Sequence, residues 1–352
     1  MARLALKDIR RGDPISGIYL VEGANFKQSR NGKPFIQMTL RDASAAVKAL
    51  RWEANRQEFR EIEKNPFLHV TGRVEEFQGA PQVIIDELDA LSAEAAKVDP
   101  TDFLPASRYS LDEMERALHG LIAEIEDDGV RELVGRVLER PIVAHGLRRA
   151  PAGKSMHHGW VGGLLEHTLS LARIAKGIAA HYPWVDESLL IAGVVLHDIG
   201  KVEELAYDVG FSYTDNGQLV GHITIAVGWI EEAAREVKGL DPEKLMHLKH
   251  LVTSHHGKLE FGSPRVPMSA EAIILHFIDN IDARIAGYLE AFETSGGSKK
   301  EASWSDYHPM FASRLFFPAD LGERVQKAEE QSSEAGPGTT TSTPPGELPF
   351  GD

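Results

Sequence analysis

The first third of the chain alternates apolar and polar residues in short runs that are separated by turn residues. Such alternation is typical of half-buried β-strands. A polar helix is predicted between the third and fourth runs, over residues 56–64. The five runs that predict strands cover residues 15–28, 34–44, 46–53, 67–78 and 82–88.

Beyond residue 110 the pattern changes to apolar residues spaced three and four apart. This spacing predicts α-helices with one or more buried faces. We therefore expect a multi-domain fold of class α and β, with an N-terminal β-domain followed by an all-α domain. The seven expected helices cover residues 111–125, 130–140, 161–182, 187–200, 223–237, 243–257 and 270–292.

Changes in composition divide the chain into four parts. Residues 1–95 form the β-domain, whose order of five strands with a helix after the third is that of an OB-fold barrel. A small β-domain that serves only for assembly is the alternative. Residues 96–110 predict an ordered linker to the all-α domain, which covers residues 111–328. Residues 329–352 predict a disordered acidic tail, whose GELPF sequence could instead dock on a protein partner.

Composition and charge limit the possible metal ligands, cellular location and binding partners of the chain. The chain has no cysteine, so any metal site must use histidine and carboxylate ligands. We expect a cytoplasmic protein without a membrane partner, because no apolar run could span a bilayer and the N-terminus lacks the apolar core of a secretory signal. The net charge is −15, yet residues 1–60 carry 12 basic and 6 acidic side chains. Whether the chain forms a homo-oligomer stays open.

Histidine and aspartate residues fall on predicted helices that are otherwise apolar. His167 shares a helix face with leucine and isoleucine residues, and the apolar run 189–196 ends in His197 and Asp198. A lone histidine on such a face is usually a hydrogen-bonded core residue. A buried aspartate, however, costs several kcal/mol unless a cation or a strong hydrogen-bond network compensates it. The remaining candidate ligands at helix ends or within a buried helix are His222, His255, His256 and Asp279, with Asp282 as the rival of Asp279.

In this order, His167, His197, Asp198 and Asp279 resemble the motif of the HD superfamily of metal-dependent phosphohydrolases. The resemblance implies that these four residues hold one divalent ion. A ligand set of nitrogen and oxygen atoms suits Mn, Fe, Co or Mg. The implied reaction is hydrolysis of a phosphoester by a metal-activated water.

The additional histidines resemble the two-metal branch of that superfamily. Asp198 would bridge to a second ion held by His222 and by His255, His256 or both. Two ions about 4 Å apart would clamp a phosphate between them. We therefore expect two divalent ions per site, with Asp198 among the catalytic residues.

Two groups beside the motif are candidates for contact with phosphate. Lys201, one turn beyond Asp198, could neutralise charge on the phosphate or merely cap the helix, and the HD resemblance favours the catalytic role. A loop bracketed by glycines suits phosphate contact, although an ordinary solvated loop has the same composition. Its candidate residues are Lys154, His157 and His158, whereas we interpret His247, His250 and His276 as structural.

A β-barrel ahead of an HD domain resembles the YhaM-type 3'-5' exoribonuclease family over most of residues 13–320. The strings PAGKSMHHGWVGGLLEHTLSLA, LHDIGKVEEL and LVTSHHG carry the resemblance. The family implies that single-stranded RNA is digested from its 3' end to nucleoside monophosphates, with single-stranded DNA as an open second substrate. One alternative is a phosphodiesterase or nucleotidase that acts on a small signalling nucleotide under regulation by the barrel. Another is a noncatalytic RNA-binding adaptor.

OB-fold barrels bind single strands through basic grooves and stacking aromatic side chains. We expect recognition of the backbone and bases with little sequence preference. For Phe35 and Trp52 the alternative is a place in the barrel core. The candidate contact residues are Phe26, Lys27, Arg30, Lys33, Phe35, Arg41, Lys48, Arg51 and Trp52.

Overall fold

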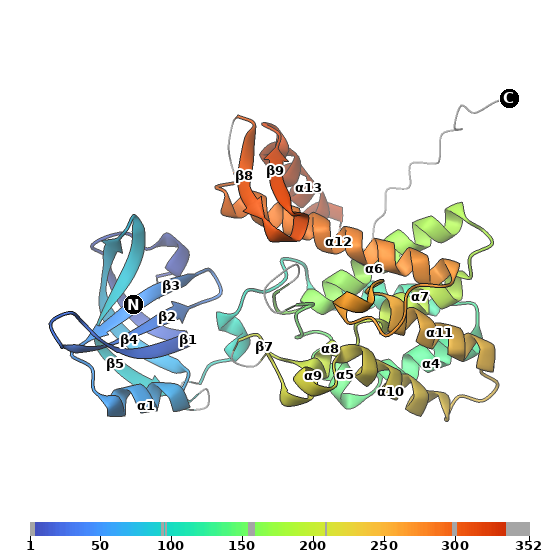
Figure 1. Cartoon of the computed structure of the whole chain (residues 1–352), viewed down its shortest axis with the longest axis horizontal. Helices are drawn as coiled ribbons and strands as arrows, with labels where there is room; N and C mark the ends of the chain where they lie inside the picture. Colours follow the sequence, from blue (N-terminus) through green and yellow to red (C-terminus); the bar gives the residue numbers. More distant parts are fainter. Residues whose placement is uncertain are drawn as a thin grey trace.

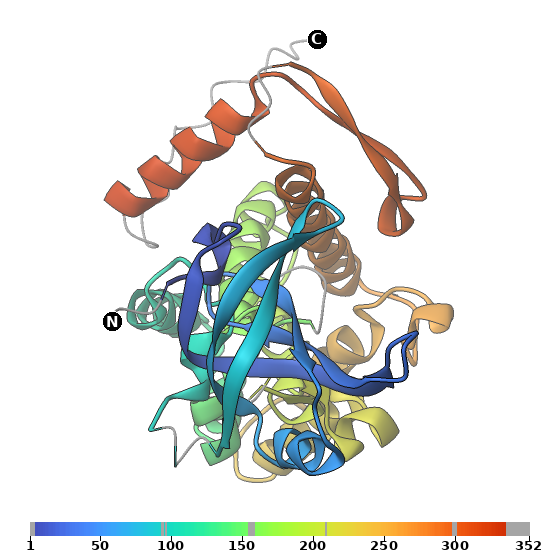
Figure 2. The ribbon, with the colours of Figure 1, turned by 90° about the vertical axis from the view of Figure 1, so that its left-hand side faces the viewer.

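The computed structural model describes residues 4–92, 95, 97–153, 159–207, 210–297 and 301–335. A β-barrel built from the first third of the chain lies beside a larger group of helices, and a C-terminal hairpin and helix extend from one end of α12 (Ala270–Thr294) (Figure 1). Viewed from the barrel's side, the strands stand in front of the helical domain (Figure 2). Among the described residues, no helix is long and apolar enough to cross a membrane.

The N-terminal domain is a closed five-stranded barrel, which confirms the predicted OB-fold. Its strands follow one another around the barrel in the order β1-β2-β3-β5-β4, and the contact between β3 and β5 is parallel. A short 3-10 helix precedes them, and α1 (Arg56–Lys64) connects β3 to β4. The strands are β1 (Pro14–Gln28), β2 (Pro34–Arg41), β3 (Ala46–Trp52), β4 (Phe67–Phe77) and β5 (Ala80–Leu91).

The alternating sequence explains which side of the barrel wall each residue occupies. On β2, Ile36, Met38 and Leu40 are buried inside, while the residues between them face outward. Helix α1 begins with a capping box in which the side chain of Asn55 accepts from the backbone of Glu58 and that of Glu58 accepts from the backbone of Asn55. The cap fixes where the polar helix starts after β3.

The predicted linker packs between the two domains. The 3-10 helix Pro100–Phe103 leads into Leu104, and the side chains of Phe103 and Leu104 are buried. They form one apolar cluster with Leu20 and Phe67 of the barrel and with Val161, which lies in the helical domain just before α6 (Gly163–His181). Burial of these side chains at the junction stabilises contact between the domains.

The helical domain contains all seven helices expected from apolar periodicity. At its centre is α7, whose residues from Leu189 to Leu196 are all buried. Three further helices, of four to six residues, are α5 (Pro141–Gly146), α8 (Lys201–Glu204) and α9 (Asp215–Leu219). The seven expected helices are α3 (Leu111–Ala123), α4 (Asp128–Leu138), α6 (Gly163–His181), α7 (Glu187–Leu196), α10 (His222–Ala234), α11 (Pro242–Ser254) and α12 (Ala270–Thr294).

The C-terminal part departs from the all-α expectation. Strands β8 (Ser303–His308) and β9 (Ser313–Phe317) form an antiparallel hairpin, and β6 (Leu205–Ala206) pairs with β7 (Ser212–Tyr213). The larger hairpin packs through Leu315 and Phe317 against Phe292 of α12. Helix α13 (Leu321–Ala335) continues past residue 329, where the disordered tail was expected to begin. The rest of that tail, residues 336–352, lies outside the described residues.

Candidate metal centre

Five helices bring the predicted ligands to one buried cluster. His167 lies in the first half of α6, and His197 and Asp198 directly follow α7. His222 is the first residue of α10. The other members, from the end of α11 and the middle of α12, are His255, His256 and Asp279.

Close backbone packing holds the turn after Asp198 against the start of α10. A Cβ atom placed on Gly200 would lie 2.2 Å from the carbonyl oxygen of His222. Glycine is therefore required at this position, because any side chain would push the two segments apart. The contact sets the distance between Asp198 and His222.

Asp198 lies between two groups of histidines. Its Oδ2 atom is 3.3 Å from Nε2 of His197 and 3.8 Å from Nε2 of His167. Its Oδ1 atom is 3.4 Å from Nε2 of His222 and 3.6 Å from Nε2 of His255. One carboxylate oxygen thus faces each group, which is the arrangement that a bridging ligand needs.

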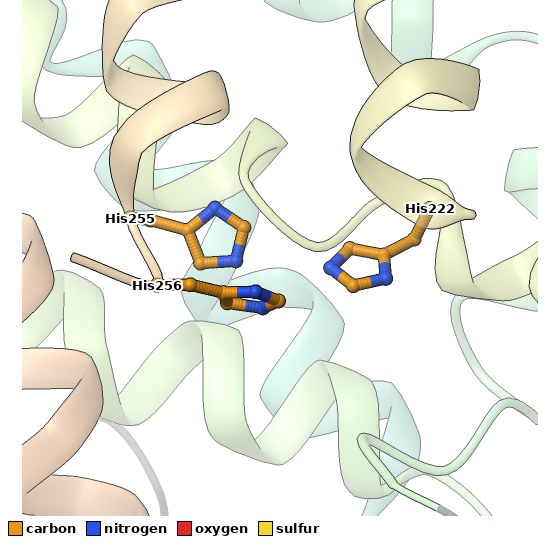
Figure 3. Close-up of side chains that lie close together, drawn as sticks. All are labelled: His222, His255 and His256. Carbon is orange, nitrogen blue, oxygen red and sulfur yellow. The ribbon is translucent and has the colours of Figure 1, made fainter. Parts of the chain in front are cut away.

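The outer members complete the two groups. On one side, Oδ1 of Asp279 lies 3.3 Å from Nε2 of His167. On the other side, the rings of His255 and His256 approach that of His222 from a different helix, and all three point toward one another (Figure 3). Within each of two triplets, His167–His197–Asp279 and His222–His255–His256, the ligand atoms all lie within 4.8 Å of one another.

The hydrogen bonds around the cluster leave the inward atoms free to bind an ion. Nδ1 of His197 donates to the carbonyl oxygen of Val194 at 2.7 Å, and Nδ1 of His255 donates to that of Val252 at 2.8 Å. Each ring consequently carries its lone pair on Nε2. In the described part of the chain, Nε2 of His197, His222 and His255 and Oδ1 of Asp198 are buried without a hydrogen-bond partner. Buried polar atoms are rarely left so, and a divalent cation fits this donor set.

Charges in the cluster shift several pKa values. Burial raises the pKa of Asp198, but Lys201 and His197 outweigh it and hold that pKa well below its usual value. Burial and the neighbouring His197 lower the pKa of His255, so its imidazole is neutral near pH 7. Burial also opposes charge on His167, yet hydrogen bonds to Asp279 and Asp282 raise its pKa to about 9. In the protein without metal, a proton on His167 thus partly balances the carboxylates.

Lys201 lies at the edge of the cluster. Its Nζ atom is 2.6 Å from Oδ2 of Asp198 and donates to the carbonyl oxygen of Ala152 at 2.7 Å. The side chain is 14% exposed. A lysine that only capped a helix end would not hold its ammonium group against the central carboxylate, so the geometry favours a place in the site.

Other residues considered from the sequence lie outside the cluster. Asp282, the rival of Asp279, accepts from Nδ1 of His167 at 2.8 Å, on the side of the ring away from the cluster. His247 and His250 hydrogen-bond to Ser269 and to the backbone of Met268. His276 donates from Nδ1 to the carbonyl oxygen of His255. The candidates in the glycine-bracketed loop, Lys154, His157 and His158, lie outside the described residues.

Comparisons with known proteins agree with this arrangement. Residues 164–284 match a family model described as HD domain, and residues 20–91 match one described as OB-fold nucleic acid binding domain. The 3'-5' exoribonuclease YhaM of Halalkalibacterium halodurans is 34% identical over 78% of this chain and 84% of its own. That of Bacillus subtilis is 36% identical over 78% of this chain and 86% of its own. This chain belongs to the YhaM family of 3'-5' exoribonucleases.

Solved structures with some likeness to this YhaM-family chain include an OB-fold domain. The second OB-fold domain of replication protein A from Methanococcus maripaludis is 13% identical, covers 25% of this chain and 93% of that domain, and gives a TM-score of 0.21. This TM-score is too low to bear on function. The HD-domain match implies that the family member binds divalent metal, and the OB-fold and the family agree with binding of single-stranded nucleic acid.

In this YhaM-family barrel, three of the predicted contact residues form one row across neighbouring strands. Lys27 on β1 is opposite Phe35 on β2, which is opposite Trp52 on β3. The neighbouring Ile36 points into the core, so the row lies on the outer face. Trp52 is 42% exposed, and its ring centroid is 4.9 Å from that of Phe35. Neither aromatic side chain is in the barrel core, which was the alternative.

Several of the basic candidates already have partners within the barrel. Lys33 pairs with Glu53 at 2.6 Å, Lys27 donates to Gln37 at 2.6 Å, and Arg41 pairs with Glu22. An exposed pair such as Lys33–Glu53 contributes little to the stability of the fold, so giving it up to bind phosphate would cost little. Arg30 and Lys48 are exposed.

Two candidates lie apart from the outer row. Arg51 is opposite the core residue Ile36 and contacts Glu58 of α1 and the carbonyl oxygen of Asp86. Phe26 is also opposite Ile36 and packs on the ring of Phe59. Both side chains therefore lie at the end of the barrel that α1 covers.

The sequence interpretation missed Glu204, Ser170 and the role of Asp282. Glu204 contacts the ring of His222, and Ser170 donates to Asp282. Spacing held a partial signal, because Ser170 and Asp282 each lie three residues after a predicted ligand and therefore on the same helix face. No periodic signal distinguishes Glu204 from its neighbour Glu203.

Proposed function

We propose that this chain is a metal-dependent 3'-5' exonuclease that hydrolyses single-stranded RNA to nucleoside monophosphates, with single-stranded DNA as a second substrate. The observation that carries the proposal is Asp198, a buried carboxylate between two groups of histidines. Among the described residues, Nε2 of His197, His222 and His255 is buried there without a hydrogen-bond partner. The curated relatives named as 3'-5' exoribonucleases support the same reaction.

In this proposal the cluster holds two ions. His167, His197 and Asp279 would hold the first, and Asp198, whose two oxygen atoms face the two groups of histidines, would contribute to both. The second would be held by His222, His255 and His256, because the ligand atoms of both adjacent histidines reach that of His222. The set lacks thiolates and therefore suits Mn, Fe, Co or Mg. When bound, the ions would supply hydroxide from water at neutral pH and polarise the phosphate.

The residues around the ions have separate tasks. The ammonium group of Lys201, held near Asp198, would neutralise charge that develops on the phosphate. Lys154, His157 and His158 are proposed to contact the phosphate from their loop. On the barrel, Lys27, Phe35 and Trp52 would hold the strand by backbone contact and base stacking, joined by Arg30 and Lys33. Arg51 would act indirectly, since it pairs with Glu58 at the covered end of the barrel.

The test is digestion of a 5'-labelled single-stranded RNA with Mn²⁺, beside a free nucleotide as a second substrate. The proposal expects a ladder that shortens from the 3' end, absent in Asp198→Asn and unchanged in Asp128→Asn, which alters an exposed aspartate of α4. Hydrolysis of the free nucleotide with intact RNA would instead favour a small-nucleotide phosphodiesterase. Binding of RNA without any hydrolysis would favour the noncatalytic adaptor.

A row of apolar side chains on α12 supports the proposal that the chain forms a homo-oligomer. Ile273, Phe277, Ile281 and Ile285 follow at intervals of four residues and are 46%, 59%, 52% and 58% exposed. Residues at this interval lie on one helix face. An exposed face of this kind marks an interaction site, and a second copy can cover it by antiparallel pairing about a two-fold axis. We expect Phe277→Lys with Ile281→Lys to reduce the mass measured by light scattering to that of one chain.

Two further proposals concern the cellular location of the protein and a partner of its C-terminal tail. The protein would act in the cytoplasm, where single-stranded RNA is available.

The acidic tail would dock on a protein partner. Deletion of residues 336–352 should remove that contact and leave RNA digestion unchanged.

A further inference from the structure

The histidines of the cluster are oriented by two different kinds of partner. His197 and His255 each donate from Nδ1 to the backbone carbonyl three residues earlier. His167 and His222 instead have a carboxylate at Nδ1. These carboxylates, Asp282 and Glu204, have not been assigned a role in the proposed reaction.

Glu204 is held firmly beside His222. Both of its carboxylate oxygens lie 3.0 Å from Nδ1 of His222, and Oε1 also accepts from the backbone N–H of His222 at 3.1 Å. The residue is 8% exposed. Its backbone is packed as well, because a Cβ atom on Gly217 would lie 2.2 Å from the carbonyl oxygen of Glu204. The contact with His222 is therefore built into the fold around α8 and α9.

Asp282 occupies the matching position beside His167. Its Oδ2 atom is 2.8 Å from Nδ1 of His167, and its Oδ1 atom accepts from the hydroxyl of Ser170 at 2.6 Å. Asp279, one turn earlier on α12, faces the other ring nitrogen at 3.3 Å. Two carboxylates of one helix thus flank a single imidazole, and only Asp279 is on the ligand side.

A carboxylate at Nδ1 changes what the imidazole can do. It accepts the Nδ1 hydrogen, keeps the lone pair on Nε2, restrains the ring and makes Nε2 more basic. His167 and His222 lie on opposite sides of Asp198, near Oδ2 and Oδ1 respectively. Each side therefore contains one histidine backed by a carboxylate and at least one without such support.

We infer that Asp282 and Glu204 are positioning residues, one for each metal ion. Asp282 orients His167 for the ion beside Asp279, and Glu204 orients His222 for the ion beside His255 and His256. This inference rests on the proposed two-ion site. It assigns the two carboxylates to separate ions. Loss of one carboxylate should therefore weaken the binding of one ion and leave the binding of the other unchanged.

The test measures Mn²⁺ binding to full-length, metal-free protein by calorimetry, with metal content checked by mass spectrometry. We expect two ions in the wild type. Asp282→Asn and Glu204→Gln should each lower the affinity for one ion by about 10- to 100-fold, the usual cost of losing a hydrogen-bond partner of a metal-binding histidine. The matched control is Glu203→Gln, because Glu203 contacts Asn216 rather than a histidine of the cluster. It should bind both ions as the wild type does.

Double variants identify which ion each carboxylate serves. If Glu204 acts through His222, Glu204→Gln should add little to the loss caused by His222→Ala. Asp282→Asn combined with His222→Ala should weaken both ions. The melting temperature of the metal-free proteins separates this effect from a purely structural one, because a structural role would lower that temperature without changing the stabilisation by Mn²⁺.

Four results would overturn the inference. Wild-type affinity for both ions in both variants would remove the positioning role while leaving the proposed metal site intact. Weakening of the same ion by both variants, or a single ion in the wild type, would refute the assignment of one carboxylate to each ion. If the wild type bound no Mn²⁺, the proposed function itself would fail, and this inference with it.

Discussion

Asp198, between the two groups of histidines, forms a largely buried ion pair with Lys201 at the edge of the cluster. Nζ of Lys201 is 2.6 Å from Oδ2 of Asp198, and the two side chains are 14% and 4% exposed. Removing one partner of such a pair leaves an uncompensated charge, which costs about 3–5 kcal/mol, whereas replacing both can be nearly neutral. In the metal-free protein, replacing one residue of the pair should therefore lower the free energy of unfolding more than replacing both residues.

We predict that Asp198→Asn lowers the free energy of unfolding of the metal-free protein by about 3 kcal/mol. The double variant Asp198→Asn with Lys201→Met should recover most of that loss, because no charge is then left unpaired. Urea denaturation in the presence of EDTA measures both values. An equal decrease in the free energy of unfolding in the single and the double variant would show that Asp198 does not compensate the charge of Lys201.

At the residue scale, the sequence was sufficient to find the candidate ligands but not their partners. His167, His197 and Asp279 could be found because a titratable residue on an apolar helix face is unusual. The partners depend on ring orientation and on contacts between distant segments. Asp282 contacts His167 across 115 positions of sequence, and no local pattern encodes such a contact.

The start of α4 shows how a single aspartate can support an element. Asp127 accepts from the backbone N–H of Val130 at the helix N-terminus and pairs with Lys244 of α11 at 2.7 Å. The hydrogen bond from Lys244, followed by that from Val130, lowers the pKa of Asp127. A pKa lower in the folded than in the unfolded state means that the charged form stabilises the fold at neutral pH.

We predict that Asp127→Asn destabilises the protein by about 0.5–1 kcal/mol at pH 7, since asparagine keeps the cap but loses the ion pair. Asp127→Ala should cost about 1–2 kcal/mol because it loses both. The effect of Asp127→Asn should be complete above the unfolded pKa of about 3.9 and should disappear as the pH falls through the lower folded value. Urea denaturation from pH 7 toward pH 3 follows it, and a pH-independent difference would contradict the ion-pair account.

The outer row of the barrel gives a prediction about RNA. Trp52→Ala should weaken binding of single-stranded RNA by about 1–3 kcal/mol, the usual contribution of one stacked base. Fluorescence anisotropy with EDTA measures binding without hydrolysis. The control is Trp184→Ala, which removes a tryptophan that is 72% exposed and lies between α6 and α7. If Trp52→Ala and Trp184→Ala bound the RNA with equal affinity, the RNA would not stack on Trp52.

At the element scale, long periodic segments were predicted well and short ones were missed. All five strands and the seven predicted helices have enough residues to show a period. Helix α13 has 15 residues but is mostly polar, so it shows no apolar period and was not predicted. Helix α8 has four residues and α9 has five, which is too few for a helical pattern to repeat. The β8–β9 hairpin was missed because its short strands carry exposed aromatic residues such as Trp304 and Phe316, which break the usual alternation with polar residues.

At the scale of the whole molecule, the barrel and the helical domain are connected by a packed linker. Phe103 and Leu104 join Leu20 of the barrel to Val161 ahead of α6, the helix that carries His167. The sequence indicated two domains and their order from the change of period at residue 110. It could not predict this apolar junction, because contacts between domains leave no periodic trace in a single chain.

The most direct test of the account follows the 3'-terminal nucleotide itself. Single-stranded RNA labelled in its last nucleotide is incubated with the full-length protein and Mn²⁺, and the products are separated over time. The account predicts that the label appears first as a nucleoside monophosphate, before the body of the RNA is shortened further, and that Asp198→Asn releases none. Label that remains in full-length RNA, or that first appears in longer fragments, would contradict 3'-5' exonuclease action by the Asp198 cluster.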